Sequence, residues 1–395
     1  MRATIAIASC NEGELLARTV HSCLETTAGL DCEVVVADDA SEDGSAERLR
    51  RRFPGVRVVS HAERRGVSLT KDLAARCARG DVLVFLDAHC KPEAGAIASL
   101  VAGVEELGGD AVLTPGIAGL DVDRWQSDLD QVGHGYAIAL ESFDLWWVQL
   151  EDLGRYQRTR FYAQPTFIGC CAAMSRKLYD HLWGFDTGMR CYGSEDVDFG
   201  VRAWLMGHAV LHDPGSVIGH RFREEFDDYK VPAEHLLANQ LRMARKTFSD
   251  AVWFDWLQRF SQRQPAALWE SAWRQYLEGC ESVERERAYQ LAHRVHDEFW
   301  YARTFGQSWP GTPAPAGGPT PGAAAGPVTA GGAASGTGVG RSPLPSAQQP
   351  PPQKARSLGP PRGLSAWGGG RSPGPAWMGR SHSPFRSPGP RPWSA

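Results

Sequence analysis

Runs of apolar residues alternate with amphipathic stretches in the first ninety residues of the chain. Strand-like runs over residues 3–9, 32–37, 56–59 and 82–86 are each followed by a helical pattern. Asn11, with Glu14 three residues later, is a plausible cap for the first of these helices. Continuous apolar runs are typical of strands that are buried on both faces, as in a parallel sheet. Strand–helix alternation at this spacing predicts βαβ units with right-handed crossovers. This part of the chain therefore predicts a Rossmann-like α/β fold.

The pattern changes beyond residue 90. Many aromatic residues stand among acids over residues 120–162, where they favour either a core layer over the sheet or a flap that stacks on sugar rings. Residues 231–303 have a helical period throughout, and their aromatic residues indicate a packing face. Further elements are expected over residues 93–107 (helix), 111–114 (strand), 164–174 (a strand of small residues) and 209–212 (strand).

Composition separates a tail from this body. From Gly306 onward the chain consists mainly of Gly, Pro, Ala and Ser, with eight basic residues and no acid. Because the whole chain carries a formal charge of −4 and the tail +8, the remainder carries −12. Such a tail cannot bury enough apolar surface to fold. We expect a flexible basic arm, with partner binding through its Pro-Trp elements as the alternative.

These patterns predict three parts: an α/β domain over residues 1–230, a helical extension over 231–305 that packs on or beside it, and a disordered tail over 306–395. The acidic body argues against nucleic acid as a partner. No apolar stretch reaches the length of a membrane span, and no signal peptide is evident. The nine cysteines are scattered and form no C-x-x-C pair. We therefore expect a reduced, cytoplasmic protein without an integral membrane span.

Acidic residues follow two of the predicted strands. Asp38 and Asp39 end the second strand, and Asp87 and His89 follow the fourth. In open α/β sheets, ligands bind at the carboxyl ends of such strands. A carboxylate next to an imidazole suits a first-row divalent ion such as Mn2+ better than Mg2+. Taken alone, each group could instead be a helix-capping turn or a solvated loop.

A second acidic pair, Glu195 and Asp196, begins a helical pattern. The helix macrodipole stabilises negative charge in a first turn, so this position alone accounts for two acids. The same position keeps a carboxylate ionised, as a general base requires.

Taken together and in order, these motifs resemble the GT-A nucleotide-sugar glycosyltransferases of family 2 type, and in particular the catalytic domain of the polypeptide N-acetylgalactosaminyltransferases. The resemblance covers roughly residues 3–260. It rests on the stretches Asn11-Glu12, Val36-Ala37-Asp38-Asp39-Ala40-Ser41, Phe85-Leu86-Asp87-Ala88-His89-Cys90, Pro165-Thr166, Asp186-Thr187-Gly188-Met189, Tyr192-Gly193-Ser194-Glu195-Asp196 and Gly219-His220-Arg221-Phe222-Arg223.

The resemblance implies a GT-A domain and a role for each site residue. Asp87, His89 and His220 would bind Mn2+, with Mg2+ as an alternative, and the ion would hold the diphosphate of a UDP-sugar. Glu195 and Asp196 would face the acceptor hydroxyl and the reacting sugar carbon. The remaining donor-site residues are Asn11, Glu12, Asp38, Asp39 (on the uracil), Lys71 and Asp87.

The chain also departs from these relatives. They carry W-G-G-E-N where this chain has Tyr192-Gly193-Ser194-Glu195-Asp196, and Asp196 resembles the base of inverting family 2 enzymes. Retaining and inverting outcomes both stay open, as does the acceptor: a glycan, a small molecule or a protein Ser/Thr. The rival from another class is a catalytically silent nucleotide-sugar-binding scaffold. A nucleotidylyltransferase is disfavoured, because the loop after the first strand is too acidic for phosphate.

Overall fold

The computed structural model describes residues 2–222 and 231–307. One large mixed sheet runs in the order β10-β12-β6-β11-β4-β1-β2-β3, with β5 paired to β12 and β7 paired to β6. Its strands are β1 (Ala3–Ser9), β2 (Cys32–Asp38), β3 (Arg57–Ser60), β4 (Val82–Asp87), β5 (Cys90–Pro92), β6 (Ala111–Asp121), β7 (Gln126–Gly133), β10 (Tyr162–Ala163), β11 (Cys171–Ser175) and β12 (Ala209–His220). A separate hairpin pairs β8 (Gly135–Ile138) with β9 (Leu145–Val148).

The first four of these strands form the predicted parallel unit. β1 pairs in parallel with both β2 and β4, and β2 pairs in parallel with β3. The connecting helices are α1 (Gly13–Thr26), α2 (Ser45–Arg52) and α3 (Val67–Cys77). The sheet becomes mixed where β11 pairs antiparallel with β4 and β6. The βαβ prediction is therefore right for this part, and the later strands extend the sheet with both orientations.

The register brings the predicted strand-end residues to one edge of the sheet. Ser9 lies opposite Asp38, and Ala8 lies opposite Asp87, so β1, β2 and β4 end at almost the same level. The long strand β12 reaches this region as well, because His220 at its end pairs with Cys90. Residues far apart in the sequence thus meet at the carboxyl ends of the parallel strands.

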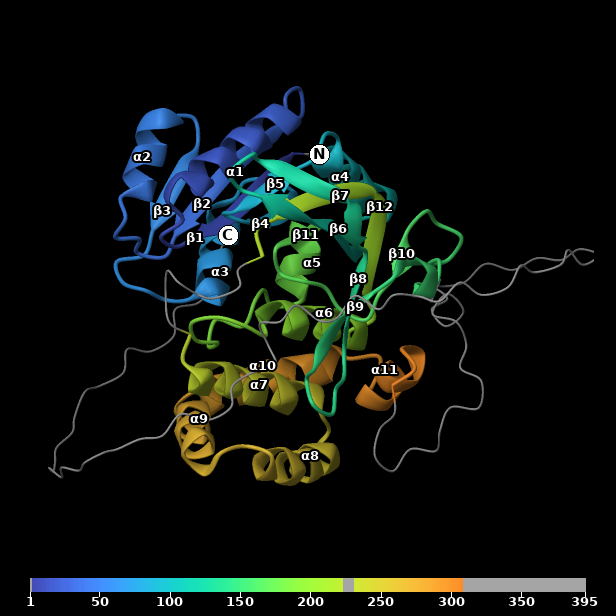
Figure 1. Cartoon of the computed structure of the whole chain (residues 1–395). Helices are drawn as coiled ribbons and strands as arrows, with labels where there is room; N and C mark the ends of the chain where they lie inside the picture. Colours follow the sequence, from blue (N-terminus) through green and yellow to red (C-terminus); the bar gives the residue numbers. More distant parts are fainter. Residues whose placement is uncertain (1, 223–230, 308–395) are drawn as a thin grey trace, which may run out of the picture. The chain divides into compact units, whose positions relative to one another are not determined.

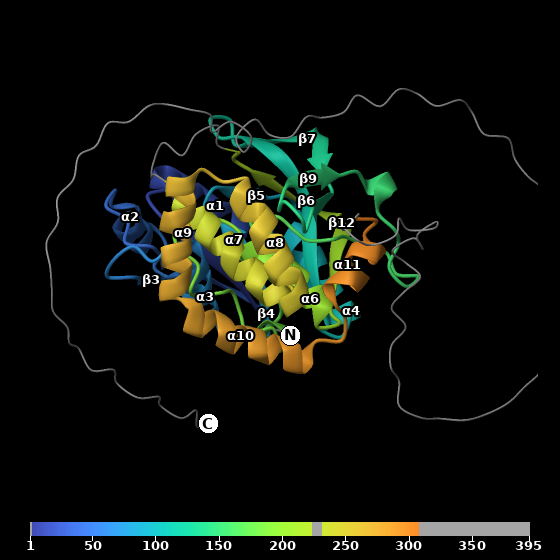
Figure 2. The same ribbon diagram turned by 90° about the horizontal axis from the view of Figure 1, so that it is seen from below.

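The remaining helices cover the sheet and form a helical extension. They are α4 (Ala96–Glu106), α5 (Arg176–His181), α6 (Glu195–Leu205), α7 (Ala233–Thr247), α8 (Asp250–Gln262), α9 (Ala266–Glu278), α10 (Cys280–His293) and α11 (Glu298–Thr304), with a 3-10 turn at Leu150–Asp152. In Figure 1, α7 to α10 lie together below α6, on the side away from the sheet, and Figure 2 shows the same group from below. The core is continuous, since buried residues from β1 to α11 belong to one cluster.

Several local expectations differ from the structure. Asn11 is not a helix cap: α1 begins at Gly13, and Asn11 has a positive φ of 53°. The strand expected over 164–174 covers only Cys171–Ser175, whereas those expected at 111 and 209 continue to Asp121 and His220. The predicted tail lies outside the described residues beyond Gln307.

The aromatic residues of 120–162 lie partly in the core and partly on the surface. Tyr136, Phe143 and Phe161 are buried in the core, whereas Trp146 on β9 is exposed. The segment therefore contributes both to packing and to the surface.

A helix that crosses a membrane must be both long and apolar, and none of the helices within the described residues meets both requirements.

Candidate functional site

The metal ligands expected from the sequence lie together. Ligand atoms of Asp87, His89 and His220 all lie within 4.8 Å of one another. Asp87 ends β4, His89 follows in a turn, and His220 ends β12. Within residues 2–222 and 231–307, no other trio of histidine, cysteine and acidic side chains meets this distance.

The spacing and surroundings of this trio fit a divalent ion. The Nε2 atoms of His89 and His220 are 3.2 Å apart. Two nitrogens bound to one ion at about 2.1 Å lie roughly 3.0–3.4 Å apart. The other ring nitrogen of His89, Nδ1, lies 3.0 Å from Oε1 of the buried carboxylate of Glu12. A carboxylate in this position is typical of metal-binding histidines, because it fixes the tautomer and orients the ring.

Lys71 connects this trio to the acidic pair. Its Nζ donates hydrogen bonds to the carbonyl of Gly169 (2.9 Å) and to Oε1 of Glu195 (3.1 Å), and lies 3.8 Å from Oδ1 of Asp87. Burial opposes the charge of this ammonium, yet Glu195, Asp87 and Asp196 together hold its pKa above the usual value. Lys71 is therefore a buried cation shared by both ends of the site.

Asp196 lies in the first turn of α6, as predicted, but its electrostatic state differs from the prediction. Burial and the neighbouring charge of Glu195 raise its pKa to about 7, although Lys71 and two backbone N–H groups oppose the shift. These N–H groups belong to Gly169 (2.6 Å) and Val197 (2.8 Å). The macrodipole alone therefore does not keep this carboxylate ionised. A pKa near neutral is nonetheless suited to a group that exchanges protons at physiological pH.

Two residues to which the sequence assigned no site role lie next to Asp196. Tyr136 on β8 is buried, and its pKa is raised by burial and by the nearby charge of Asp196. At Gly169, an added Cβ would come within 3.0 Å of Lys71 and Asp196. Only a residue without a side chain fits at this position. Tyr136 was visible in the sequence only as one of many aromatic residues.

The acids at the end of β2 form a separate group beside β1. Both carboxylate oxygens of Asp39 accept backbone hydrogen bonds, from Arg65 (2.6 Å) and Gly66 (3.0 Å). Asp38 is buried, and within the described residues its Oδ1 has no hydrogen-bond partner, nor does Oγ of Ser9 opposite it. Asp39 thus fixes the loop before α3 through its hydrogen bonds. Asp38 places a buried carboxylate oxygen, Oδ1, at the strand ends, where it can accept a hydrogen bond from a ligand.

Asn11 belongs to the same group. Its Oδ1 accepts a hydrogen bond from the backbone of Glu42 (2.8 Å), and its own N–H donates to Ser41 (2.8 Å). Asn11 therefore joins the loop after β1 to the loop after β2.

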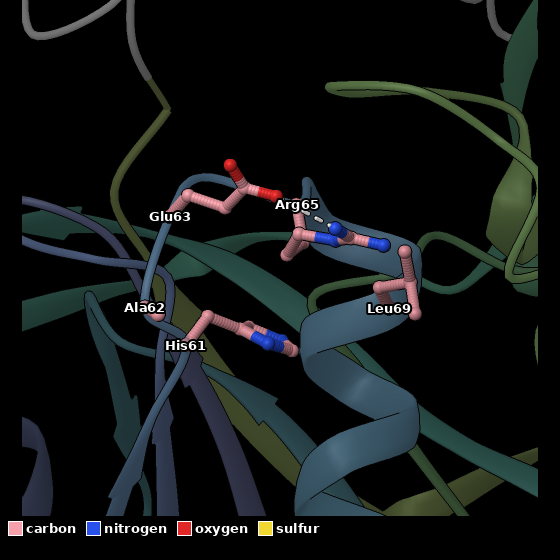
Figure 3. Close-up of a pocket in the computed structure, with 5 residues that line it drawn as sticks. All are labelled: His61, Ala62, Glu63, Arg65 and Leu69. Atoms are coloured by element: carbon pink, nitrogen blue, oxygen red, sulfur yellow. Dashed lines mark hydrogen bonds and ion pairs between the residues drawn. The ribbon is translucent and has the colours of Figure 1, made fainter. Parts of the chain in front are cut away.

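A hollow of about 350 Å3 lies on the loop that Asp39 holds. Figure 3 shows the side chains that line it, with the Glu63–Arg65 ion pair across the loop and Leu69 on α3. None of the predicted site residues lines this hollow. Its lining residues are His61, Ala62, Glu63, Arg65 and Leu69.

Comparison with known proteins identifies the class of domain. Residues 4–183 match the family model "Glycosyl transferase family 2", and residues 155–223 match "N-terminal domain of galactosyltransferase". Residues 4–183 are therefore similar to glycosyl transferase family 2 domains, and the predicted GT-A fold is confirmed.

The sequence is similar to polypeptide N-acetylgalactosaminyltransferases. It is 31% identical to the mouse (Mus musculus) enzyme 3 over 252 residues, which cover 61% of this chain and 39% of that protein. It is also 31% identical to mouse enzyme 12 over 280 residues, which cover 67% and 46%. The chain thus spans less than half the length of these relatives.

A crystal structure of GalNAc-T7 with UDP, GalNAc and Mn2+ has a similar fold. The TM-score is 0.58 at 21% identity, over 76% of this chain and 56% of that one. The two proteins share the GT-A arrangement of sheet and helices.

Proposed function

We propose that the chain is a glycosyltransferase that uses Mn2+ to move a sugar from a UDP-sugar to a hydroxyl acceptor. The observation that carries this proposal is the position of Asp87, His89 and His220 on one side of Lys71, with Glu195 and Asp196 on the other. The relatives named as polypeptide N-acetylgalactosaminyltransferases and the UDP and Mn2+ of the GalNAc-T7 crystal support the donor and the metal.

At the donor end, Asp87, His89 and His220 would hold the ion, and Glu12 would orient His89. A bound cation offsets the negative charge that develops as the nucleoside diphosphate leaves. Asp38 and Asp39 would serve the nucleoside, with Asp38 Oδ1 as the available buried acceptor. Asn11 would act by shaping this loop rather than by capping a helix.

At the acceptor end, we propose Asp196 as the base that receives the hydroxyl proton, with Glu195 held by Lys71. The near-neutral pKa of Asp196 supports this assignment, and it favours direct displacement with inversion. The acceptor classes are a glycan, a small molecule or a protein Ser/Thr.

The deciding experiment measures nucleotide release from a panel of UDP- and GDP-sugars with Mn2+. We expect turnover of a UDP-sugar that is lost in Asp87→Ala and His89→Ala, by on the order of 10²–10³. Asp110→Ala, which removes an exposed acid elsewhere, is the control. Turnover that persists in both metal-site variants would refute the metal assignment. UDP binding with no turnover of any donor would instead support the silent scaffold.

The site residues also make distinct predictions for transfer. Asp196→Asn should abolish transfer to an acceptor while UDP and Mn2+ still bind. If transfer stays near the wild-type rate, Glu195 or the substrate supplies the base. The anomeric configuration of the product, measured by NMR, decides between inversion and retention.

We further propose that the protein acts in a reducing compartment such as the cytoplasm. All nine cysteines are free, and Cys23, Cys90, Cys170 and Cys171 are buried. Titration of the unfolded protein from its native source with a thiol reagent should find nine thiols. A smaller number would show that disulfides form, against this proposal.

A further inference from the structure

Three buried polar side chains lie on one face of α7, in the helical extension. Asn239, Arg242 and Lys246 are spaced three and four residues apart, which places them on the same side of the helix. Their exposed fractions are 1%, 3% and 1%. We call these three residues the α7 polar stripe. Because burying such groups is costly unless they are hydrogen-bonded or paired, their partners indicate their role.

Asn239 holds the loop that precedes the acidic pair. Its Oδ1 accepts the N–H of Arg190 (2.8 Å), and its Nδ2 lies within donating distance of the carbonyls of Arg190 (2.9 Å), Gly193 (3.0 Å) and Tyr192 (3.3 Å). A single residue, Ser194, separates the loop 190–193 from Glu195. One carboxamide therefore fixes the backbone that delivers the acidic pair to the site.

Arg242 and Lys246 bind carboxylates on either side of the loop 190–193 in the sequence: Asp186 before it and Asp198 after it. Arg242 makes a two-pronged contact with Asp186 (2.6 and 3.0 Å), and Lys246 reaches Asp186 (2.6 Å). Lys246 also lies 3.0 Å from Asp198, which is on α6 two residues after Asp196. A Cβ on Gly188 would lie 2.1 Å from the guanidinium of Arg242, so a glycine is required for this approach.

The opposite side of the loop rests on the start of α3. The N–H of Val67 donates to the carbonyl of Cys191 (2.9 Å), and a Cβ on Gly66 would lie 2.7 Å from the backbone nitrogen of Cys191. Since α3 carries Lys71, the loop 190–193 is held between α7 and the helix of the shared cation. The acidic pair is therefore bracketed by contacts on both sides.

We propose that the α7 polar stripe positions Glu195 and Asp196, so that the helical extension is a working part of the active site. This inference rests on the proposed function for the role of the acidic pair. The stripe residues do not touch the reacting groups themselves and are positioning residues. A stripe that only stabilised the fold would raise global stability without any specific effect on residues 190–200.

The test compares Asn239→Leu, which keeps the branched shape of the side chain but removes the hydrogen bonds, with Arg245→Gln. Arg245 lies on the same helix, but its ion-pair partners Glu284 and Asp250 belong to the extension alone. Hydrogen–deuterium exchange of residues 190–200 should accelerate by about 10- to 100-fold in Asn239→Leu, as loss of several buried hydrogen bonds implies. In Arg245→Gln it should stay within about twofold of wild type.

Two functional readouts accompany the exchange measurement. The affinity for UDP with Mn2+, measured by calorimetry, should stay within about twofold in Asn239→Leu. The kcat for nucleotide release from UDP-N-acetylgalactosamine, or the best donor of the panel, should fall at least about tenfold. Asn239→Asp, which keeps the acceptor for Arg190 but loses the donors, is a second variant if Asn239→Leu does not fold.

The outcomes are distinguishable. Faster exchange confined to residues 190–200, with lower kcat and unchanged UDP affinity, supports the positioning role. Exchange in 190–200 that matches Arg245→Gln, or that rises equally throughout the chain, overturns it. If wild type itself turns over no donor, the proposed function fails, while the exchange data still decide whether the stripe holds the loop.

Discussion

At the scale of single residues, the contact between Glu12 and His89 makes a specific prediction. Glu12→Ala removes the carboxylate from Nδ1 of His89, so the ring loses its preferred orientation and tautomer. The affinity for Mn2+ in the presence of UDP should fall about 10- to 100-fold. Calorimetric titration of the metal measures this change without turnover.

Glu14→Ala is the matched control for this variant. Glu14 is a neighbouring carboxylate on α1, but it is exposed and pairs with Arg52 on α2. Its Mn2+ affinity should equal that of wild type. Equal affinities in both variants would show that Glu12 does not support the metal site.

The raised pKa of Asp196 predicts that the free energy of unfolding of the protein depends on pH. Its pKa rises from 3.8 to about 7 on folding, so between these values the folded chain retains a proton that the unfolded chain releases. Wild-type stability therefore loses this contribution as pH rises through that window. Asp196→Asn lacks the ionisation, and its stability relative to wild type should increase between pH 4 and 8 by up to about 4 kcal/mol.

Urea unfolding of both proteins at several pH values checks this prediction. Glu270→Gln, a change at an exposed acid on α9, gives the background. A stability difference between Asp196→Asn and wild type that does not change with pH would show that the carboxylate is ionised throughout.

The sequence marks individual candidate residues but not the contacts between them. Asp87 and His89 stand out because an abrupt change from apolar to polar residues marks a strand end. The distance from His89 to Glu12, 77 residues earlier, depends on how β1 and β4 pair, which no local pattern encodes. The raised pKa of Asp196 depends on its burial and on Glu195, and burial at a helix start is set by the surrounding fold.

At the scale of elements, the junction between α3 and the loop 190–193 predicts the effect of a single methyl group. Gly66 has φ +90°, and a Cβ there would meet the backbone of Cys191 at 2.7 Å. Gly66→Ala should lower the free energy of unfolding by about 1–2 kcal/mol for the backbone conformation, with a further ~1–3 kcal/mol for the contact. Chemical denaturation measures the sum.

Gly29→Ala separates the two effects. Gly29 has nearly the same φ, +88°, but a Cβ there would meet nothing within 4 Å. This variant should show only the conformational cost. If the free energy of unfolding falls by the same amount in both variants, the loop 190–193 moves to accommodate the methyl group and the contact itself adds no cost.

Elements with a regular pattern were predicted more accurately than those defined by their neighbours. The apolar runs of β1, β2 and β4 and the helical periods of α2 and α3 match the structure closely. Asn11 misled because an Asn followed three residues later by Glu14 is typical of a helix start. Its side chain instead bonds to Glu42, on a loop that comes close only in the folded chain.

At the scale of the whole molecule, the proposed division of the chain can be tested by truncation. A chain that ends after Gln307 keeps every described element, and it keeps the Gln307 side chain, which accepts from the backbone N–H of Leu140 and donates to the carbonyl of Ile138. We expect this chain to unfold in a single transition and to bind UDP with Mn2+ as the full chain does. Calorimetry measures both properties.

A chain that ends at residue 230 provides the contrast. It lacks α7, and with it Lys246, the buried cation that lies between Asp186 and Asp198. Leaving buried carboxylates uncompensated costs about 3–5 kcal/mol, so this chain should not fold stably. A stable chain of 230 residues would mean that the α/β part is an independent domain.

The position of Lys71 couples metal binding to protonation at the other end of the site. Its ammonium interacts electrostatically with both Asp87 and Glu195. A metal cation that neutralises Asp87 therefore leaves the ammonium to stabilise the negative charge of the acidic pair more strongly. Linkage makes this effect reciprocal: protonation of Asp196 must alter cation affinity by the same factor. Binding of Mn2+ should therefore release a proton from Asp196, so that the metal end and the acceptor end of the site would be coupled through Lys71 before any acceptor arrives.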